Sequence, residues 1–240
     1  MAKTIGILGL GRFGLMTYDH LRALAPRVWT RDASKLAGLE GASSFEQAAA
    51  SDIVVLTVAI SAMPEVCARL APLLRPGQIV ADTCSVKVDP IGVMMGLLPE
   101  AVQILGTHPL FGPDSGKDGI VGMKIVLCPV RIDPVAYDGI REFLRALGLQ
   151  VIEATPEEHD RQVARTQAIF HLLAQALGRL GWGGEPIATP GPEGFFRQVL
   201  TLRNDSFQLF QDMQRRNPFA AEYRERFLEE LRRLDSELGE

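Results

Sequence analysis

The residues near the N-terminus that most clearly suggest chemistry are three glycines in a G-x-G-x-x-G pattern. They directly follow an apolar run, in the segment Gly9-Leu10-Gly11-Arg12-Phe13-Gly14. Glycines at these positions allow a tight turn, close approach of the backbone to a pyrophosphate, and close packing of strand against helix. A tight turn without a ligand would also use glycines, but the position after the first expected strand favours an anion at the helix N-terminus. We therefore predict a dinucleotide bound by Gly9, Gly11, Arg12, Phe13 and Gly14.

The end of the second expected strand indicates which dinucleotide is bound. An acid that holds the adenosine ribose is expected about 20 residues after the first glycine. Thr30 stands there, 21 residues after Gly9, with Arg31 beside it. A hydroxyl followed by a guanidinium suits a 2′-phosphate better than a bare ribose, so we predict NADP over NAD, with Thr30 and Arg31 as ligands. Two alternatives stay open: a small shift in register would make Asp32 the ribose acid for NAD, and Arg31 would be a solvated surface charge.

Two further segments carry reactive side chains directly after apolar runs. The first reads Asp82-Thr83-Cys84-Ser85-Val86-Lys87, and the second, residues 106–117, is rich in glycine and proline around His108. In doubly wound sheets, ligands gather at the carboxyl ends of the strands. We expect both segments at that edge, with 106–117 as a rigid active-site loop.

A third set of polar residues interrupts an otherwise apolar stretch. Asp160, Gln167 and His171 are separated by seven and four residues, so at roughly 100° per residue they share one face of a continuous helix. Polar groups on such a face must be hydrogen-bonded or line a wet cavity. We expect them to form one wall of a substrate cleft; the alternative is a set of mutually satisfied polar core groups.

Cys84 receives no catalytic role, and the histidines receive no role in binding a metal. Cys84 lacks the triad partners of a cysteine nucleophile, and a buried structural cysteine is the commoner case. The histidines at positions 108, 159 and 171 show no spacing typical of a zinc site. We therefore predict no metal.

Short apolar runs alternate with helical stretches over the first 150 residues. They are rich in Ile, Val and Leu without strict alternation, as expected for strands covered on both faces. Strands that alternate with helices predict an α/β fold, a doubly wound Rossmann-type sheet that is mostly parallel. Strands are expected at residues 4–8, 27–29, 53–58, 79–81, 102–106, 123–127 and 150–152.

The pattern changes after Glu153 and predicts a smaller all-helical domain. Helices are expected over residues 163–180, 195–214 and 219–238. We place a dinucleotide-binding domain at residues 1–153 and a helical substrate and dimerisation domain at residues 154–240. A bundle of under 90 residues buries little core of its own, which favours a homodimer built through these helices.

The composition excludes several classes of protein. The 240 residues are 47% hydrophobic and 22% charged, which is ordinary for a globular protein. The net charge of −4 and the lack of a basic block argue against a nucleic-acid partner. No uncharged run approaches the roughly 18 residues of a membrane span, and no secretory signal is expected. Three scattered cysteines indicate a reducing compartment, the cytoplasm, and no disulfide framework.

Taken together, these motifs resemble the prephenate/arogenate dehydrogenase family of tyrosine biosynthesis. The glycine motif is followed by Asp82-x-x-Ser85-x-Lys87 and by Thr107-His108-Pro109-x-Phe111-Gly112-Pro113-x-Ser115-Gly116, as in that family. Glu158-His159-Asp160 and Gln167-x-x-x-His171 are similar to the start of its helical domain. Residues 201–210 resemble its short arogenate-using branch. The resemblance covers nearly the whole chain.

The resemblance implies oxidative decarboxylation of arogenate to tyrosine with hydride transfer to NADP. It implies that His108 accepts the proton of the ring hydroxyl, a role that suits a neutral imidazole. Ser85 would hydrogen-bond in the same region, and Asp160 would support His171. The small-molecule substrate would be bound by Asp114, Gln167, His171, Asp205 and Lys87.

One segment departs from the prephenate-specific pattern. Thr201 stands where such members carry an arginine, and Asp205 is placed to pair with the ammonium of arogenate. A carboxylate there would repel the keto acid of prephenate, although Arg203 nearby is an alternative partner for a substrate carboxylate. The other functions that stay open are a prephenate dehydrogenase that gives 4-hydroxyphenylpyruvate and a non-catalytic NADP-binding homologue. A 3-hydroxyacid dehydrogenase or imine reductase is disfavoured, because those enzymes usually carry a lysine on the long helix.

Overall fold

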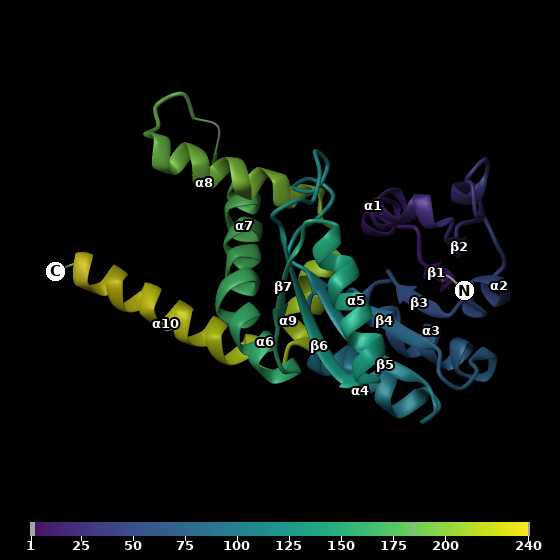
Figure 1. Ribbon diagram of the computed structural model, residues 1–240. Coiled ribbons are helices and arrows are strands. Elements are labelled where there is room, and N and C mark those ends of the chain that lie inside the picture. Colours follow the sequence, from purple (N-terminus) through teal and green to yellow (C-terminus); the bar gives the residue numbers. More distant parts are fainter. Residues whose placement is uncertain (1–2, 184, 240) are drawn as a thin grey trace. The chain divides into compact units, whose positions relative to one another are not determined.

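The computed structural model describes residues 3–183 and 185–239, with the side chain of Arg203 outside the described part. The chain divides into two compact units, unit 1 (Met1–Pro156) and unit 2 (Glu157–Glu240). Figure 1 shows their elements.

Unit 1 is built on a seven-stranded sheet with the order β2-β1-β3-β4-β5-β6-β7. The neighbouring strands are parallel except β5 and β6, which are antiparallel. The expected α/β fold with a mostly parallel sheet is confirmed, and a strand lies at each of the expected places. The strands are β1 (Ile5–Leu8), β2 (Arg27–Trp29), β3 (Ile53–Leu56), β4 (Ile79–Asp82), β5 (Gln103–Pro109), β6 (Lys124–Arg131) and β7 (Gln150–Glu153).

Helices between the strands contribute side chains to the core clusters of the sheet. Tyr18 of the first helix packs against Ile7 and Val28 in one core cluster. Tyr137 packs against Leu127 in another, which holds the helix before β7 on the sheet. The helices are α1 (Arg12–Leu21), α2 (Phe45–Ala49), α3 (Met63–Leu70), α4 (Val88–Leu97) and α5 (Pro134–Ala146) (Figure 1).

The strand order places a topological switch point next to β1. The chain runs from β1 to β2 on one side and then to β3 on the other side of β1. In doubly wound sheets, ligands bind at the carboxyl ends of the strands that flank such a point. The segments after β1 and β3 are therefore the first place to look for a ligand site.

Unit 2 is helical, as expected, but its helices are interrupted. A π-helical segment, Ala164–Ala168, separates α6 (Pro156–Val163) from α7 (Ile169–Leu180), so the expected helix over 163–180 is present but not continuous. Ala164 and Ala168 form a small core cluster with Ala220. The remaining helices are α8 (Pro190–Thr201), α9 (Phe207–Arg216) and α10 (Ala220–Leu238).

The prediction of a single helix over residues 195–214 is wrong. A 3₁₀ turn, Leu202–Asn204, ends α8, and Asp205 is extended with a ψ angle of 145°. Ser206 then caps α9, because its hydroxyl accepts a hydrogen bond of 3.1 Å from the Leu209 N–H. A serine at the N-cap favours a new helix start over continuation of the old helix.

Candidate active site

The glycine loop after β1 has the backbone that a pyrophosphate site needs. Gly9 has a φ angle of +112°, and a Cβ there would lie 2.6 Å from the Thr57 carbonyl oxygen. A Cβ at Gly14 would lie 2.4 Å from the Gly9 carbonyl oxygen, so α1 packs directly on the loop. By contrast, a Cβ at Gly11 would meet no described atom within 4 Å. The space beside the middle glycine is therefore open to a ligand, and the residues present fit a bound dinucleotide.

Thr57, which the sequence analysis did not single out, closes the other side of this loop. Its hydroxyl lies 2.8 Å from the Gly9 carbonyl oxygen, and its N–H donates to the Leu8 carbonyl at 2.9 Å. Thr57 thereby joins the ends of β1 and β3 at the switch point. Its position directly after an apolar strand was the signal that could have identified it.

The end of β2 lies against the same glycine loop. The Gly9 N–H donates to the Trp29 carbonyl at 2.8 Å, which brings Thr30 beside the loop. Arg31 and Asp32 are exposed. The Asp32 carboxylate accepts hydrogen bonds from the hydroxyl and the N–H of Ser34 at 2.6 and 3.2 Å. The hydroxyl bond is the main reason that the pKa of Asp32 lies below its ordinary value.

A buried ion pair joins the ends of β4 and β5. The Lys87 ammonium donates to the Asp82 carboxylate and to the Thr107 carbonyl oxygen. Asp82 also accepts from the Cys84 N–H at 2.9 Å, and the Thr107 hydroxyl donates to the Asp82 carbonyl. Asp82 and Lys87 are both 0% exposed. The expectation that Lys87 binds substrate does not fit this burial; the side chain instead fixes two neighbouring segments to each other.

These contacts hold the segments of Ser85 and His108 at one edge of the sheet. Leu8, Leu56, Asp82 and Gly106 pair with one another across β1, β3, β4 and β5. Ser85 follows this row by three residues on the β4 side and is half-buried, and His108 follows it by two on the β5 side and is 3% exposed. The sheet register therefore brings the two proposed catalytic side chains to the edge that carries the glycine loop.

Arg12 and Asp114 connect the glycine loop to the loop after β5. One guanidinium nitrogen of Arg12 lies 2.8 and 2.9 Å from the two carboxylate oxygens of Asp114. A Cβ at Gly116 would lie 3.0 Å from the Met16 sulfur, so this loop also packs closely on α1. A predicted cofactor ligand and a predicted substrate ligand thus form an ion pair with each other.

In unit 2, Gln167 and His171 flank the junction of the π-helical segment with α7. Gln167 is half-buried and His171 is 5% exposed. Burial lowers the pKa of His171 to about 4, so its imidazole is neutral at physiological pH. The Gln214 side-chain amide donates to the Ala168 carbonyl at 2.7 Å, which satisfies a backbone group of the π-helical segment.

The expected support of His171 by Asp160 is replaced by another pair. The Asp160 carboxylate lies 2.8 Å from His159 Nδ1, and both side chains are buried. A carboxylate close to His171 would raise the pKa of that histidine, whereas burial lowers it. The physical reason is the π-helical segment, because its wider turns invalidate the angle of about 100° per residue that aligned Asp160 with His171.

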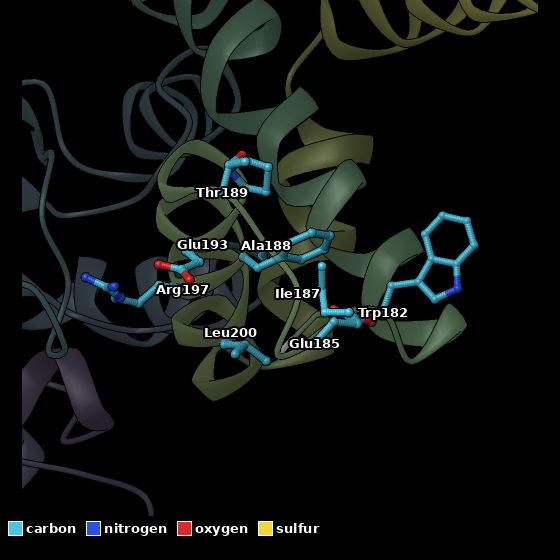
Figure 2. Close-up of a pocket in the computed structure, with 10 residues that line it drawn as sticks. Trp182, Glu185, Ile187, Ala188, Thr189, Glu193, Arg197 and Leu200 are labelled. Atoms are coloured by element: carbon cyan, nitrogen blue, oxygen red, sulfur yellow. The ribbon is translucent and has the colours of Figure 1, made fainter.

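Asp205 lies in the break between α8 and α9, and it lines a pocket of about 480 Å³. The pocket is bounded by residues of α7, α8, the 3₁₀ turn and α9: Ala174, Gln175, Gly178, Arg179, Val199, Leu202 and Phe207. A second groove, of about 610 Å³, is formed by the loop after α7 and by α8. Figure 2 shows its lining, which includes Trp182, Ile187 and Arg197 but none of the predicted site residues.

Comparison with known proteins identifies the family. Residues 30–153 match the family model for the nucleotide-binding domain of prephenate dehydrogenase. The chain is 32% identical, over 98% of its length, to arogenate dehydrogenase 2, chloroplastic, of Arabidopsis thaliana, of which it covers 67%. The chain belongs to the prephenate dehydrogenase family.

Further relatives of this family member differ in length. Arabidopsis thaliana arogenate dehydrogenase 1, chloroplastic, is 31% identical over 93% of the chain, which spans only 37% of that relative. In unit 2, residues 176–240 match a family model described as the TYRAAT1-like C-terminal domain. This match begins within α7 and covers the later part of the helical unit.

Solved structures of the prephenate dehydrogenase family share the fold. A prephenate dehydrogenase from A. aeolicus in complex with hydroxyphenyl propionate and NAD+ has a TM-score of 0.76 at 21% identity, with 98% of this chain and 90% of that chain covered. The Synechocystis arogenate dehydrogenase has a TM-score of 0.72 at 22% identity, with 98% and 92% covered.

The described residues of this prephenate dehydrogenase family member contain neither a bilayer-spanning helix nor a metal-ligating cluster. Of the helices in residues 3–183 and 185–239, none combines the length and the hydropathy of a bilayer-spanning segment. The described residues contain no group of three or more His, Cys, Asp or Glu side chains placed to hold a metal ion.

Proposed function

We propose that this protein catalyses the oxidative decarboxylation of arogenate to tyrosine, with NADP as hydride acceptor. The observation that carries the proposal is the row of paired residues Leu8, Leu56, Asp82 and Gly106. It places the glycine loop, the Ser85 segment and the His108 segment at one edge of the sheet. Ligands bind at this edge in doubly wound folds.

The reaction breaks three bonds of the substrate: the C–H and O–H bonds at the carbinol carbon and the bond between the ring and its carboxylate. A hydride leaves the carbinol carbon, the hydroxyl proton goes to His108, and carbon dioxide leaves as its bonding electron pair makes the ring aromatic. His108 then returns the proton to the phenolate oxygen of the product. A bound nicotinamide supplies the hydride acceptor. Ser85 donates a hydrogen bond near the reacting hydroxyl, and the chain's main task is to align the groups. Gln167 and His171 are proposed to bind the substrate, with His171 as a neutral hydrogen-bonding group.

Arogenate is favoured over prephenate by Asp205 and by the names of two relatives. Arogenate carries an ammonium on its side chain where prephenate carries a keto group, and a carboxylate favours the ammonium. Both Arabidopsis thaliana relatives are named arogenate dehydrogenases. Asp205 lines a pocket, which gives such a carboxylate a place to meet a small molecule.

NADP is favoured over NAD by the residues after β2. Arg31 is exposed beside the glycine loop and is proposed, with Thr30, to bind the 2′-phosphate. Asp32, the residue that would otherwise hold a ribose hydroxyl, is engaged by Ser34. At the pyrophosphate, Arg12 would exchange its Asp114 partner for the cofactor. The A. aeolicus relative has NAD+ bound, so the choice between the two cofactors must be measured.

We also propose a homodimer through the helical unit, in a reducing compartment such as the cytoplasm. The last turns of α10 expose Leu231, Leu234 and Leu238 by 44%, 47% and 87%, and such a row favours burial against a second copy. Within the described residues, Cys67, Cys84 and Cys128 form no disulfide and are buried, which fits a reducing compartment.

A two-by-two assay tests the proposal. Reduction of NADP or NAD is followed by absorbance at 340 nm with arogenate or prephenate as substrate. We expect the highest kcat/KM for arogenate with NADP. A higher kcat/KM for prephenate would reassign the substrate, and turnover with neither substrate would leave a non-catalytic homologue.

A further inference from the structure

The pocket that contains Asp205 has walls of opposite charge over an apolar floor. Asp205 comes from the extended break before α9, and Arg179 comes from the last turn of α7. The floor includes Val199, which is 0% exposed, and Ala174, which is 5% exposed. At about 480 Å³, the pocket lies within the size range of small-molecule sites.

Both charged groups are positioned by their neighbours. The Arg179 guanidinium lies 5.6 Å from the centre of the Phe207 ring, within the range of a cation–π contact. The Asp205 N–H donates to the Leu202 carbonyl at 3.1 Å, and the cap at Ser206 fixes where α9 begins. The two charges are therefore attached to helix ends that are themselves defined.

The pocket continues the helix face that carries His171. Gln175 and Gly178, which line it, follow His171 by four and seven residues within the regular helix α7. At about 100° per residue these positions share one face. Unlike the stretch before residue 169, this part of the chain has no π-helical segment between the residues that are compared.

We propose that this pocket binds an α-amino acid head group, with Arg179 on the carboxylate and Asp205 on the ammonium. The inference rests on the proposed function, because it takes the ligand to be the side chain of arogenate or the corresponding part of tyrosine. Arg179 then serves as a substrate-binding residue. A carboxylate is common to the side chains of arogenate and prephenate, whereas only arogenate has the ammonium. Arg179 therefore contributes affinity, and Asp205 contributes the choice between the two.

Three phenols that differ only in the head group separate the two roles. L-Tyrosine has both charges, tyramine has only the ammonium, and 3-(4-hydroxyphenyl)propionate has only the carboxylate. Binding of each to the full chain is measured by titration calorimetry for the wild type, Arg179→Gln and Asp205→Asn. Arg197→Gln, on the other groove, is the matched control, and thermal melting checks the fold of every variant.

In the expected result, called the crossed pattern, each of the two variants weakens the binding of a different pair of probes. Arg179→Gln weakens the binding of tyrosine and of the propionate by about tenfold, the size of one charge-assisted hydrogen bond. Tyramine keeps its wild-type affinity. Asp205→Asn weakens tyrosine and tyramine by a similar factor and spares the propionate. Arg197→Gln changes none of the three.

Other outcomes overturn the inference. These are equal weakening of all three probes, no weakening by either variant, and no binding of any probe to the wild type. The assay with arogenate is scored separately. If the crossed pattern holds without turnover, the proposed reaction fails and the amino acid site stands; if turnover holds without the pattern, the site fails and the reaction stands.

Discussion

The polar cluster at the ends of β4 and β5 and the polar residues around the π-helical segment are held by different means. In unit 1, Asp82 pairs with Gly106 in the parallel ladder, so the backbone sets the spacing before the Lys87 side chain adds its bonds. In unit 2, single side-chain hydrogen bonds set the spacing instead. Gln214 reaches the Ala168 carbonyl across 46 residues of sequence, and Asn217 donates to the Asp160 carbonyl at 2.8 Å.

Because of this difference, we expect the two regions to respond differently to substitution. A side chain that extends from a strand end can be replaced while the ladder keeps its neighbours in place. A side chain that satisfies a backbone carbonyl of a helix carries part of the fold itself, because an unsatisfied buried carbonyl is costly. We therefore expect substitutions of proposed catalytic residues in unit 1 to affect rate, and changes in buried polar groups to affect stability.

The largest expected effect comes from His108→Asn. Loss of a general base lowers kcat by about 10²- to 10⁴-fold, with the affinity for NADP retained, because the glycine loop is untouched. Steady-state kinetics with arogenate and fluorescence titration with NADPH measure the two quantities. His20→Asn on α1 is the control and should keep wild-type kinetics. Normal turnover of the His108 variant would show that the proton acceptor lies elsewhere.

The buried pair of unit 1 provides the next test. Lys87→Met leaves the Asp82 carboxylate without its ammonium partner, and removal of one member of a buried ion pair costs about 3–5 kcal/mol of unfolding free energy. We expect the double variant Asp82→Asn, Lys87→Met to recover part of this loss. Chemical denaturation of Lys87→Met, Asp82→Asn and the double variant measures the cycle. A loss in the double variant equal to the sum of the single losses would contradict the coupling.

The buried His171 predicts a pH dependence of stability. Its pKa falls from 6.5 to about 4 on folding, so between these values the unfolded chain binds more protons than the folded chain. The contribution of neutral His171 to the free energy of unfolding is then fully present above pH 6.5. It declines as the pH falls towards 4, by about 3 kcal/mol in all. Denaturant unfolding at several pH values measures the decline, and His171→Gln should reduce its slope. An unchanged slope in that variant would assign the dependence to other groups.

The smallest expected effect concerns the cofactor. Arg31→Ala removes one charged contact to the 2′-phosphate. We expect it to weaken the binding of NADP by about tenfold, or about 1.4 kcal/mol, and to leave the affinity for NAD unchanged. Calorimetric titration with both cofactors measures this, with the exposed Arg22→Ala as a control. Unaltered NADP affinity in the Arg31 variant would remove the argument for that residue.

The strands could be predicted from sequence because their apolar runs are local signals. The position of the Ser85 and His108 segments at one edge of the sheet could be predicted too, because parallel strands end at one side of a sheet. The ends of β5 and β6 were placed too early, since each strand gains residues from antiparallel pairing with the other. Their mutual register is a contact between segments that no single run of residues encodes.

Unit 2 was harder to predict, for two separate reasons. The break before α9 had a local signal, because Asn204, Asp205 and Ser206 are all residues that favour helix starts. The π-helical segment had none, since one of its carbonyls is bound by Gln214 from a distant helix. The predicted alignment of Asp160 with His171 was wrong because the whole π-helical segment lies between them. Gln167 and His171, by contrast, are only four residues apart.

The π-helical segment also has a consequence for how this protein tolerates length changes. Its turn holds about one residue more than an α-helical turn, so deletion of a single residue between Ala164 and Ala168 would leave an unbroken α-helix from Pro156 to Leu180. The extra residue is taken up within the wide turn, so its removal would leave the residues after it in their present orientation. His171 would keep its present neighbours, and Asp160 would stay beside His159. Homologues that lack this residue are therefore expected to present the same face of α7 from an uninterrupted helix.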